Sequence, residues 1–178
     1  MKKTTACIAY TLFLCATDAM AQVPDVLGVW EFDPQASALP EGLLLDSALP
    51  EGSLLASETR SYDLRNDGYL VNVVIRKAPN GRLDFIQVVS KSDGKDYPQY
   101  QSFPLAAFQI NGTKTPVRYS ETVLDEHAVN AVVKYGDRVT NRSVRRVAPD
   151  GKTMRIDVTA IDQNGIETPF FLVFDKVR

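Results

Sequence analysis

Met154-Arg155-Ile156-Asp157-Val158-Thr159-Ala160 is the stretch that decides the fold. Apolar and polar residues alternate in it without an error, and this period of two predicts a β-strand with one buried face. We expect the even-numbered residues to face the core. Rows with a similar period predict further strands with inward faces made of Val71, Val73 and Ile75, of Leu83, Phe85 and Val89, and of Val129, Ala131 and Val133.

Turn motifs separate these strands from Glu58 onward. They contain Gly, Asn and Asp, which tolerate the backbone conformations that tight strand reversals need. No stretch in this part of the chain has apolar residues at three-and-four spacing over ten positions, so we expect few helices. The motifs are Asn66-Asp67-Gly68, Pro79-Asn80-Gly81, Ser92-Asp93-Gly94, Tyr135-Gly136-Asp137, Pro149-Asp150-Gly151 and Gln163-Asn164-Gly165.

The pattern favours an all-β fold, an antiparallel up-and-down β-barrel. With an opening strand at 27–32 and a closing strand at 168–177, we expect eight to ten strands. Closing a meander into a barrel removes the two exposed edges that would otherwise pair with other chains. A two-sheet sandwich with short connections is the alternative.

The composition is that of one globular domain. The chain has 178 residues, of which 44% are hydrophobic and 24% charged, and its formal net charge is -2. These values exclude a disordered tail and a fibrous repeat. They also exclude a bulk positive field that would hold a phosphate backbone, so we expect no nucleic-acid partner.

Residues 1–21 have the features of a signal peptide. A basic start at Lys2 and Lys3 precedes the apolar run 6–16, which is too short to span a membrane. Ala19 and Ala21 then supply the small residues that a signal peptidase needs, which predicts cleavage before Gln22. We expect a secreted or periplasmic protein that comprises one domain, residues 22–178. Lipidation at Cys15 is the alternative.

Cleavage of this leader removes Cys7 and Cys15, the two cysteines of the chain. The exported protein then has no disulfide, no thiol nucleophile and no thiolate ligand.

A tandem duplication interrupts the strand pattern. The decamer 37–46 (SALPEGLLLD) is followed at once by 47–56 (SALPEGSLLA). Recurring Pro and Gly argue against a long helix, so we expect an extended loop over 33–57. It is either a neutral insertion or a flap that contacts a membrane or protein through its leucines, namely Leu39, Leu43, Leu44, Leu45, Leu49, Leu54 and Leu55.

Trp30 is the only tryptophan and lies in an apolar strand near the start of the mature chain. An indole there buries a large apolar area, so we expect it to close one end of the core. Gly28 and Trp30 form the Gly-x-Trp motif that lipocalins and other calycins share. Two further stretches, 91–98 (KSDGKDYP) and 145–154 (RRVAPDGKTM), are similar to stretches of uncharacterised exported bacterial lipocalin-like proteins.

The resemblance covers 27–176 and departs at the duplicated decamer and at Ala148, where these relatives often carry Ser. It implies a calycin-type barrel but no particular activity. It also implies that a cation from the end of the last strand stacks on Trp30, which would be Arg178 or, failing it, Lys176.

The sequence contains no motif for catalysis, a metal or a cofactor. His127 is the single histidine, in a polar turn, and we expect it to be solvated. One histidine without thiols does not make a zinc site. A nucleophile elbow, a P-loop and a dinucleotide fingerprint are all absent from the sequence. We therefore expect no cofactor and no metal, and a protein that is more readily a binding protein than an enzyme.

The strand at 138–147 is polar on both faces. If Val139 and Val147 mark the interior, then Asn141, Ser143 and Arg145 also point inward. In the opposite register Val144 faces inward and the arginines reach the rims. A buried Arg145 requires an anion, which is either Glu121 across the barrel or a ligand carboxylate. With Tyr119, Glu121 and Tyr135 it would form the polar floor of a ligand pocket.

Three functions fit these features. The first is a non-enzymatic exported protein that binds a small amphipathic or lipid-like ligand at Arg145, Asn141, Tyr119, Glu121 and Tyr135. The second is a structural or interaction protein that acts through loop 37–56. The third is an isomerase or cyclase in a calycin-like barrel that uses Tyr119, Glu121 or Arg145.

Overall fold

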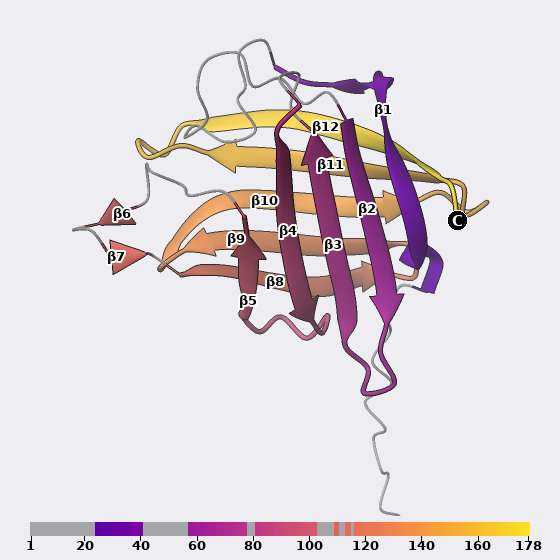
Figure 1. Cartoon of the computed structure of the whole chain (residues 1–178), viewed down its shortest axis with the longest axis horizontal. Helices are drawn as coiled ribbons and strands as arrows, with labels where there is room; N and C mark the ends of the chain where they lie inside the picture. Colours follow the sequence, from indigo (N-terminus) through magenta and orange to yellow (C-terminus); the bar gives the residue numbers. More distant parts are fainter. Residues whose placement is uncertain (1–23, 41–56, 78–80, 103–108, 111–112, 115) are drawn as a thin grey trace, which may run out of the picture.

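The structure, a computed structural model, describes residues 24–40, 57–77, 81–102, 109–110, 113–114 and 116–178. Over these residues the fold is all-β, with one closed antiparallel barrel and a separate pair of short strands (Figure 1). In chain order the elements are the 3-10 turn η1 (Pro24–Val26) and the strands β1 (Gly28–Ala38), β2 (Ser57–Leu64), β3 (Leu70–Lys77), β4 (Leu83–Ser90), β5 (Tyr97–Gln101), β6 (Gln109–Ile110), β7 (Thr113–Lys114), β8 (Val117–Asp125), β9 (Ala128–Tyr135), β10 (Arg138–Val147), β11 (Thr153–Ile161) and β12 (Glu167–Lys176).

The barrel has ten strands in the order β1-β12-β11-β10-β9-β8-β5-β4-β3-β2. Strand β1 pairs with both β12 and β2, and these two pairings close the ring. The predicted all-β barrel of eight to ten strands is therefore confirmed, and the sandwich is excluded. The leader 1–21, with both cysteines, lies outside the described residues.

Gly28 lies where the first and last strands meet. Its φ is +120°, and a Cβ atom there would lie 2.1 Å from the carbonyl oxygen of Arg178. That oxygen accepts a hydrogen bond of 2.7 Å from the backbone N–H of Val29. The glycine of the Gly-x-Trp motif thus allows the chain end to lie against β1, which any other residue would prevent.

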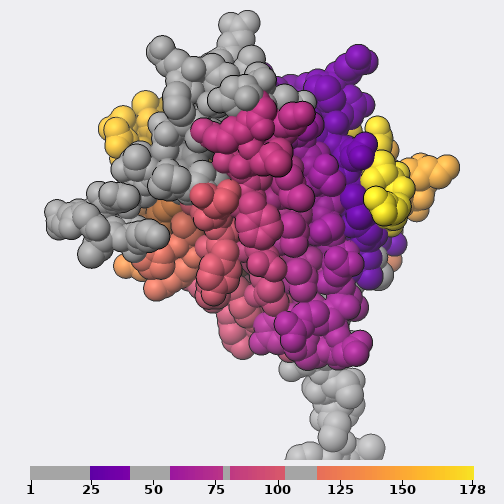
Figure 2. All heavy atoms as spheres, in the orientation of Figure 1, coloured from indigo at the N-terminus to yellow at the C-terminus, as the bar shows by residue number. Residues whose placement is uncertain are grey.

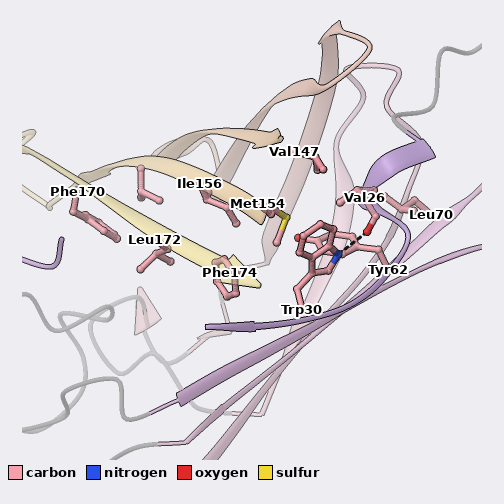
Figure 3. Packing of buried hydrophobic residues seen from close by; sticks show 11 residues of the cluster. Val26, Trp30, Tyr62, Leu70, Val147, Met154, Ile156, Phe170, Leu172 and Phe174 are labelled. Atoms are coloured by element: carbon pink, nitrogen blue, oxygen red, sulfur yellow. Dashed lines mark hydrogen bonds between the residues drawn. The ribbon is translucent and has the colours of Figure 1, made fainter. Parts of the chain in front are cut away.

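Trp30 fills the closed end of the barrel. It is fully buried, and its indole Nε1–H donates a 2.7 Å hydrogen bond to the carbonyl of Val26 in η1 (Figure 3). The cation over its ring is Lys176, whose Nζ lies 5.2 Å from the ring centroid. The expectation of Arg178 in that place is corrected, because Arg178 contributes its backbone carbonyl to the seam. The surrounding cluster comprises Tyr62, Leu70, Val147, Met154, Ile156, Val158, Phe170, Leu172 and Phe174.

Trp30→Ala is expected to destabilise the protein by about 3 to 5 kcal/mol, because the indole leaves a cavity that the barrel walls cannot close. Lys176→Met is the control, which removes only the cation above the ring and is expected to cost about 1 kcal/mol or less. Urea unfolding followed by circular dichroism measures both. A cost below about 1 kcal/mol for Trp30→Ala would contradict the packing described here.

The predicted inward face is correct for β11 and β9. Met154, Ile156 and Val158 are buried in the barrel, and so are Val129 and Ala131. These strands alternate cleanly because their inner positions are apolar, which is the condition under which the period of two identifies the core.

The predicted faces of β3 and β4 are wrong. On β3 it is Leu70, Asn72 and Val74 that are buried, whereas Val71 and Val73 face outward and Ile75 is 46% exposed. On β4 it is Asp84, Val88 and Ser90 that are buried, whereas Leu83 is 63% exposed and Phe85 and Val89 share its face. The outer face of these strands is toward the viewer in Figure 2.

The register between strands explains this error. Inward-facing Glu58, Arg60 and Tyr62 on β2 pair directly with Arg76, Val74 and Asn72 on β3. Residues that pair directly across two strands share a face, so β3 must turn the same set of positions inward. The outward row is apolar as well, with Ile75 beside Phe85, and apolar content alone could not tell the two faces apart.

The first strand is longer than predicted. It continues from residue 33 to Ala38, with an irregularity in its pairing with β12 between Asp33 and Ala38. The Asp33 carboxylate accepts hydrogen bonds from the N–H groups of Gln35 and Ala36, and Ser37 Oγ accepts one from Val173 N–H. These contacts hold a bulge in a strand where the sequence predicted the start of a loop.

Most of the duplicated decamer, residues 41–56, lies outside the described residues. Of its seven leucines only Leu39 is described, and it is half-buried against the hydrophobic cluster around Trp30. Leu39 thus uses part of its side chain for packing.

Candidate functional site

A cavity of about 250 Å³ lies inside the barrel. Residues at its rim come from the ends of β10, β11 and β12, at the end of the barrel opposite Trp30. The wall contains both apolar and polar side chains. The apolar ones are Val74, Ile86, Val88, Val133, Ile156, Val158, Ala160, Ile161, Phe170 and Leu172, and the polar ones are Arg60, Asn72, Arg76, Gln99, Gln101, Tyr119, Tyr135, Thr140, Asn141, Ser143, Asp162 and Thr168.

Three of the five residues predicted to bind a ligand line this cavity. Tyr119, Tyr135 and Asn141 reach it from three adjacent strands, β8, β9 and β10. Ser143 lines it as well, so β10 presents the face that contains Asn141, Ser143 and Arg145 to the interior. The alternative register, with Val144 inward, is excluded by the burial of Arg145 and Val147.

Arg145 is buried but does not line the cavity. Its side chain is 6% exposed, and its Nη2 lies 3.5 Å from Oε2 of Glu121, whose side chain is 1% exposed. The sequence left two anions open as the partner of Arg145, namely Glu121 and a ligand carboxylate. The structure places Glu121 beside this guanidinium. Glu121 is not across the barrel, because β8 and β10 both pair with β9 and therefore lie two strands apart.

Two hydrogen bonds satisfy the carboxylate of this pair, whereas Arg145 Nε has no hydrogen-bond partner among the described residues. The Glu121 carboxylate accepts bonds from the Ser92 hydroxyl at 2.5 Å and from the Tyr119 hydroxyl at 2.7 Å. The Cζ atom of Arg145 lies 4.7 Å from the centroid of the Tyr62 ring. The carboxylate and the guanidinium balance each other in charge, and this neutral network lies between the cavity and the hydrophobic end of the barrel.

Burial and neighbouring charges set the protonation states in this network. Burial alone lowers the pKa of the Arg145 guanidinium, but Tyr62 and Glu121 outweigh burial and raise it, so the group stays charged. Burial, together with the nearby Glu121 carboxylate, raises the pKa of the Tyr119 phenol well above its ordinary value. Tyr119 therefore remains a hydrogen-bond donor at neutral pH.

A second charged cluster was missed by the sequence prediction. The fully buried carboxylate of Glu58 accepts a 2.5 Å hydrogen bond from Arg60 Nε and a 2.6 Å bond from Arg76 Nε. The side chains of Arg60 and Arg76 are 14% and 18% exposed, and both line the cavity. The spacing Glu58-x-Arg60-x-Tyr62 put three inward residues on one strand, but the wrong face assigned to β3 concealed Arg76.

The two arginines decide the ionisation of Glu58. Burial by itself raises the pKa of this carboxyl, but the charges of Arg60 and Arg76 and the hydrogen bonds from them lower it below its ordinary value of 4.5. A carboxyl with a lowered pKa in the folded state stabilises the fold at pH values above its unfolded pKa. That stabilisation is lost as the pH falls through the folded pKa.

The pH dependence of stability is expected to reveal this cluster. As the pH falls from about 6 to about 3, the wild-type protein should lose more unfolding free energy than Glu58→Gln, because the variant has no carboxylate to protonate there. Glu31→Gln, at an exposed position on β1, serves as the control and should follow the wild type. Urea titrations at a series of pH values measure the slopes. Equal slopes for the wild type and Glu58→Gln would contradict this assignment.

His127 lies in the turn between β8 and β9, as predicted, but it is only one-third exposed. Its Nδ1 lies 2.9 Å from the Asp25 carboxylate, so it attaches this turn to η1. Among the described residues no group of three or more His, Cys, Asp or Glu side chains is placed to hold a metal ion. The described residues also include no helix that is long and apolar enough to cross a membrane.

The fold is an antiparallel up-and-down β-barrel like those of lipocalins and fatty-acid-binding proteins. Among solved structures, a point mutant of the fluorescent protein UnaG aligns with 88% of this chain and 99% of its own. The TM-score is 0.56 and the sequence identity is 12%, so the likeness concerns the fold. No protein-family model matches the chain. No curated protein matches its sequence either.

Proposed function

We propose that this protein is a non-enzymatic binding protein that takes a small amphipathic ligand into the barrel. The observation that carries the proposal is the internal cavity, whose wall contains apolar and polar side chains in similar numbers. Cavities of this composition bury the apolar part of a ligand and orient it through its polar group. Tyr119, Tyr135 and Asn141 are proposed as polar contacts to the ligand.

Arg145 and Glu121 have a different role in this proposal. Because they neutralise each other and do not line the cavity, they support the ligand site by holding Tyr119 in place. The hydroxyl of Tyr119 donates to Glu121, and the tyrosine itself lines the cavity. Removal of either charge would leave the other buried and unpaired, which costs about 3 to 5 kcal/mol in typical proteins.

The size of the cavity restricts the ligand. Its volume of about 250 Å³ is slightly below the range of roughly 300 to 1,000 Å³ that is usual for ligand pockets. A long-chain lipid would not be enclosed in such a space. The proposal therefore concerns a compact ligand with a short apolar part.

Titration with 1-octanol, followed by calorimetry, tests the proposal. Binding should be saturable and show a negative heat-capacity change, the mark of buried apolar surface. Val133→Phe, which fills the cavity from β9, should weaken binding by at least about tenfold. Val132→Phe is the matched control. Val132 pairs with the exposed Arg142 on β10, so its side chain points to the outer face of the barrel.

The proposal is overturned if neither 1-octanol nor its carboxylate analogue octanoate binds saturably to the folded protein. Equal affinities of the wild type and Val133→Phe would overturn it as well, because the alcohol would then be bound elsewhere.

We also propose that the protein is exported as one of a group of bacterial lipocalin-like proteins. The support is the sequence of the leader, with its basic start, its short apolar run and the small residues before Gln22. Export would place a cysteine-free chain in an oxidising compartment, where its barrel forms without disulfides.

Intact-mass measurement of the protein secreted by an expressing bacterium tests the export. The expected mass is that of residues 22–178 without modification. A mass that includes the leader, or a lipid attached to Cys15, would contradict the predicted cleavage.

A further inference from the structure

An ion-paired cluster on the cavity wall contains one more positive charge than its carboxylate neutralises. Arg60 and Arg76 both line the cavity, and within the described residues the only carboxylate paired with either is Glu58. Glu58 uses one oxygen for each guanidinium and is itself fully buried. The three side chains together carry a net charge of one positive unit next to the cavity.

The neighbouring carboxylates do not remove this excess. Asp84 is buried beside Arg76, but it is paired with Arg82 at distances of 3.2 and 2.9 Å. Asp162 lies at the rim, where its Oδ1 accepts 2.8 Å hydrogen bonds from the N–H groups of Asn164 and Ile166. The Asp162 carboxylate is thus hydrogen-bonded within its own turn, and because it faces solvent its charge is screened.

An unbalanced guanidinium in an enclosed space is unfavourable without an anion. Charges inside a barrel interact more strongly than charges in water, and a buried positive charge is stable only when it is paired. Arg60 keeps its positive charge, because Glu58 outweighs the effect of burial and raises the pKa of the guanidinium. The stable occupant of this cavity is therefore one that brings a negative charge.

We propose that the ligand is a monoanion whose charged group binds between Arg60 and Arg76, with Glu58 as the residue that positions both guanidiniums. This inference rests on the proposed function and specifies its ligand. A single negative charge neutralises the cluster, whereas a neutral ligand leaves it charged and a dianion charges it in the opposite sense. A carboxylate suits the planar fork of arginine, which binds such oxygens in pairs.

The apolar part of the ligand would lie along another part of the cavity wall. Ile156, Val158 and Phe170 line the cavity from β11 and β12, whereas Arg60 and Arg76 come from β2 and β3. The cavity volume of about 250 Å³ suits a chain of medium length. A carboxylate with a chain of medium length, such as octanoate, is thus a suitable probe.

Calorimetric titration with octanoate, 1-octanol and octyl phosphate at about pH 8 tests the charge preference, since phosphate monoesters are dianions there. The wild type is expected to bind octanoate at least about tenfold more tightly than 1-octanol or octyl phosphate. Arg76→Gln neutralises the cluster and should abolish the advantage of octanoate over 1-octanol. Arg60→Gln should do the same and serves if the first variant does not fold.

Glu58→Gln should act in the opposite direction. It leaves two unbalanced guanidiniums, so octyl phosphate should become the preferred ligand of this variant. A merely structural role of Glu58 would lower the affinity for all three compounds together. The matched control is Arg142→Gln, which removes one positive charge from the outer face, where Arg142 pairs with the exposed Glu167. Its affinities should equal those of the wild type.

Two results separate failure of this inference from failure of the proposed function. If 1-octanol binds the wild type as tightly as octanoate, the barrel binds ligands but the assigned anion site is wrong. If none of the three compounds binds, the proposed function and the inference both fail. An equal loss of octanoate affinity in Arg142→Gln and Arg76→Gln would also overturn the inference, because only general electrostatics would then be at work.

Discussion

The contact between the two ends of the barrel is the constraint on which the rest of the structure depends. Val29 donates its N–H to the Arg178 carbonyl, and Val177 donates its N–H to Val29. The meander becomes a ring only where β1 meets β12, and the glycine at position 28 makes room for that meeting. Without this closure, β1 or β12 would be an exposed edge and the interior would open to solvent.

Closure allows the interior to be divided into two parts with different chemistry. At one end Trp30, Tyr62 and Phe174 exclude water and form the hydrophobic core. Toward the other end the inward positions of β2, β3 and β4 are occupied by charged residues such as Glu58, Arg76 and Asp84. The first part stabilises the fold by burying apolar surface, and the second part gives the cavity its polarity.

The two buried ionic clusters of the barrel differ in charge balance. Arg145 and Glu121 form a pair of equal and opposite charges, and Tyr119 and Ser92 satisfy the carboxylate. Such a pair is balanced in charge without a ligand, although Arg145 Nε has no hydrogen-bond partner among the described residues. Glu58 pairs with two guanidiniums, so this cluster is balanced in charge only when one further anion joins it. This difference moves the expected anion site from Arg145 to Arg60 and Arg76.

The sequence by itself determined the all-β architecture, the positions of the turns that the structure describes and the burial of Trp30. These features follow from local rules, because the period of two, the turn residues and the size of an indole act within a few residues of chain. The same rules identified the inner face of β11, where polar residues occupy only the outer positions. They also placed Tyr119, Tyr135 and Asn141 in the interior, and in the structure these residues line the cavity.

Only the tertiary structure decided which face of β3 and β4 points inward and which acid pairs with Arg145. Apolar residues occupy both faces of these two strands, so their orientation is imposed by register with β2, an interaction between residues far apart in the sequence. Ion pairs inside a barrel depend on strand order and on distances of a few ångströms. The cluster of Glu58, Arg60 and Arg76 therefore became visible only once the strands were side by side.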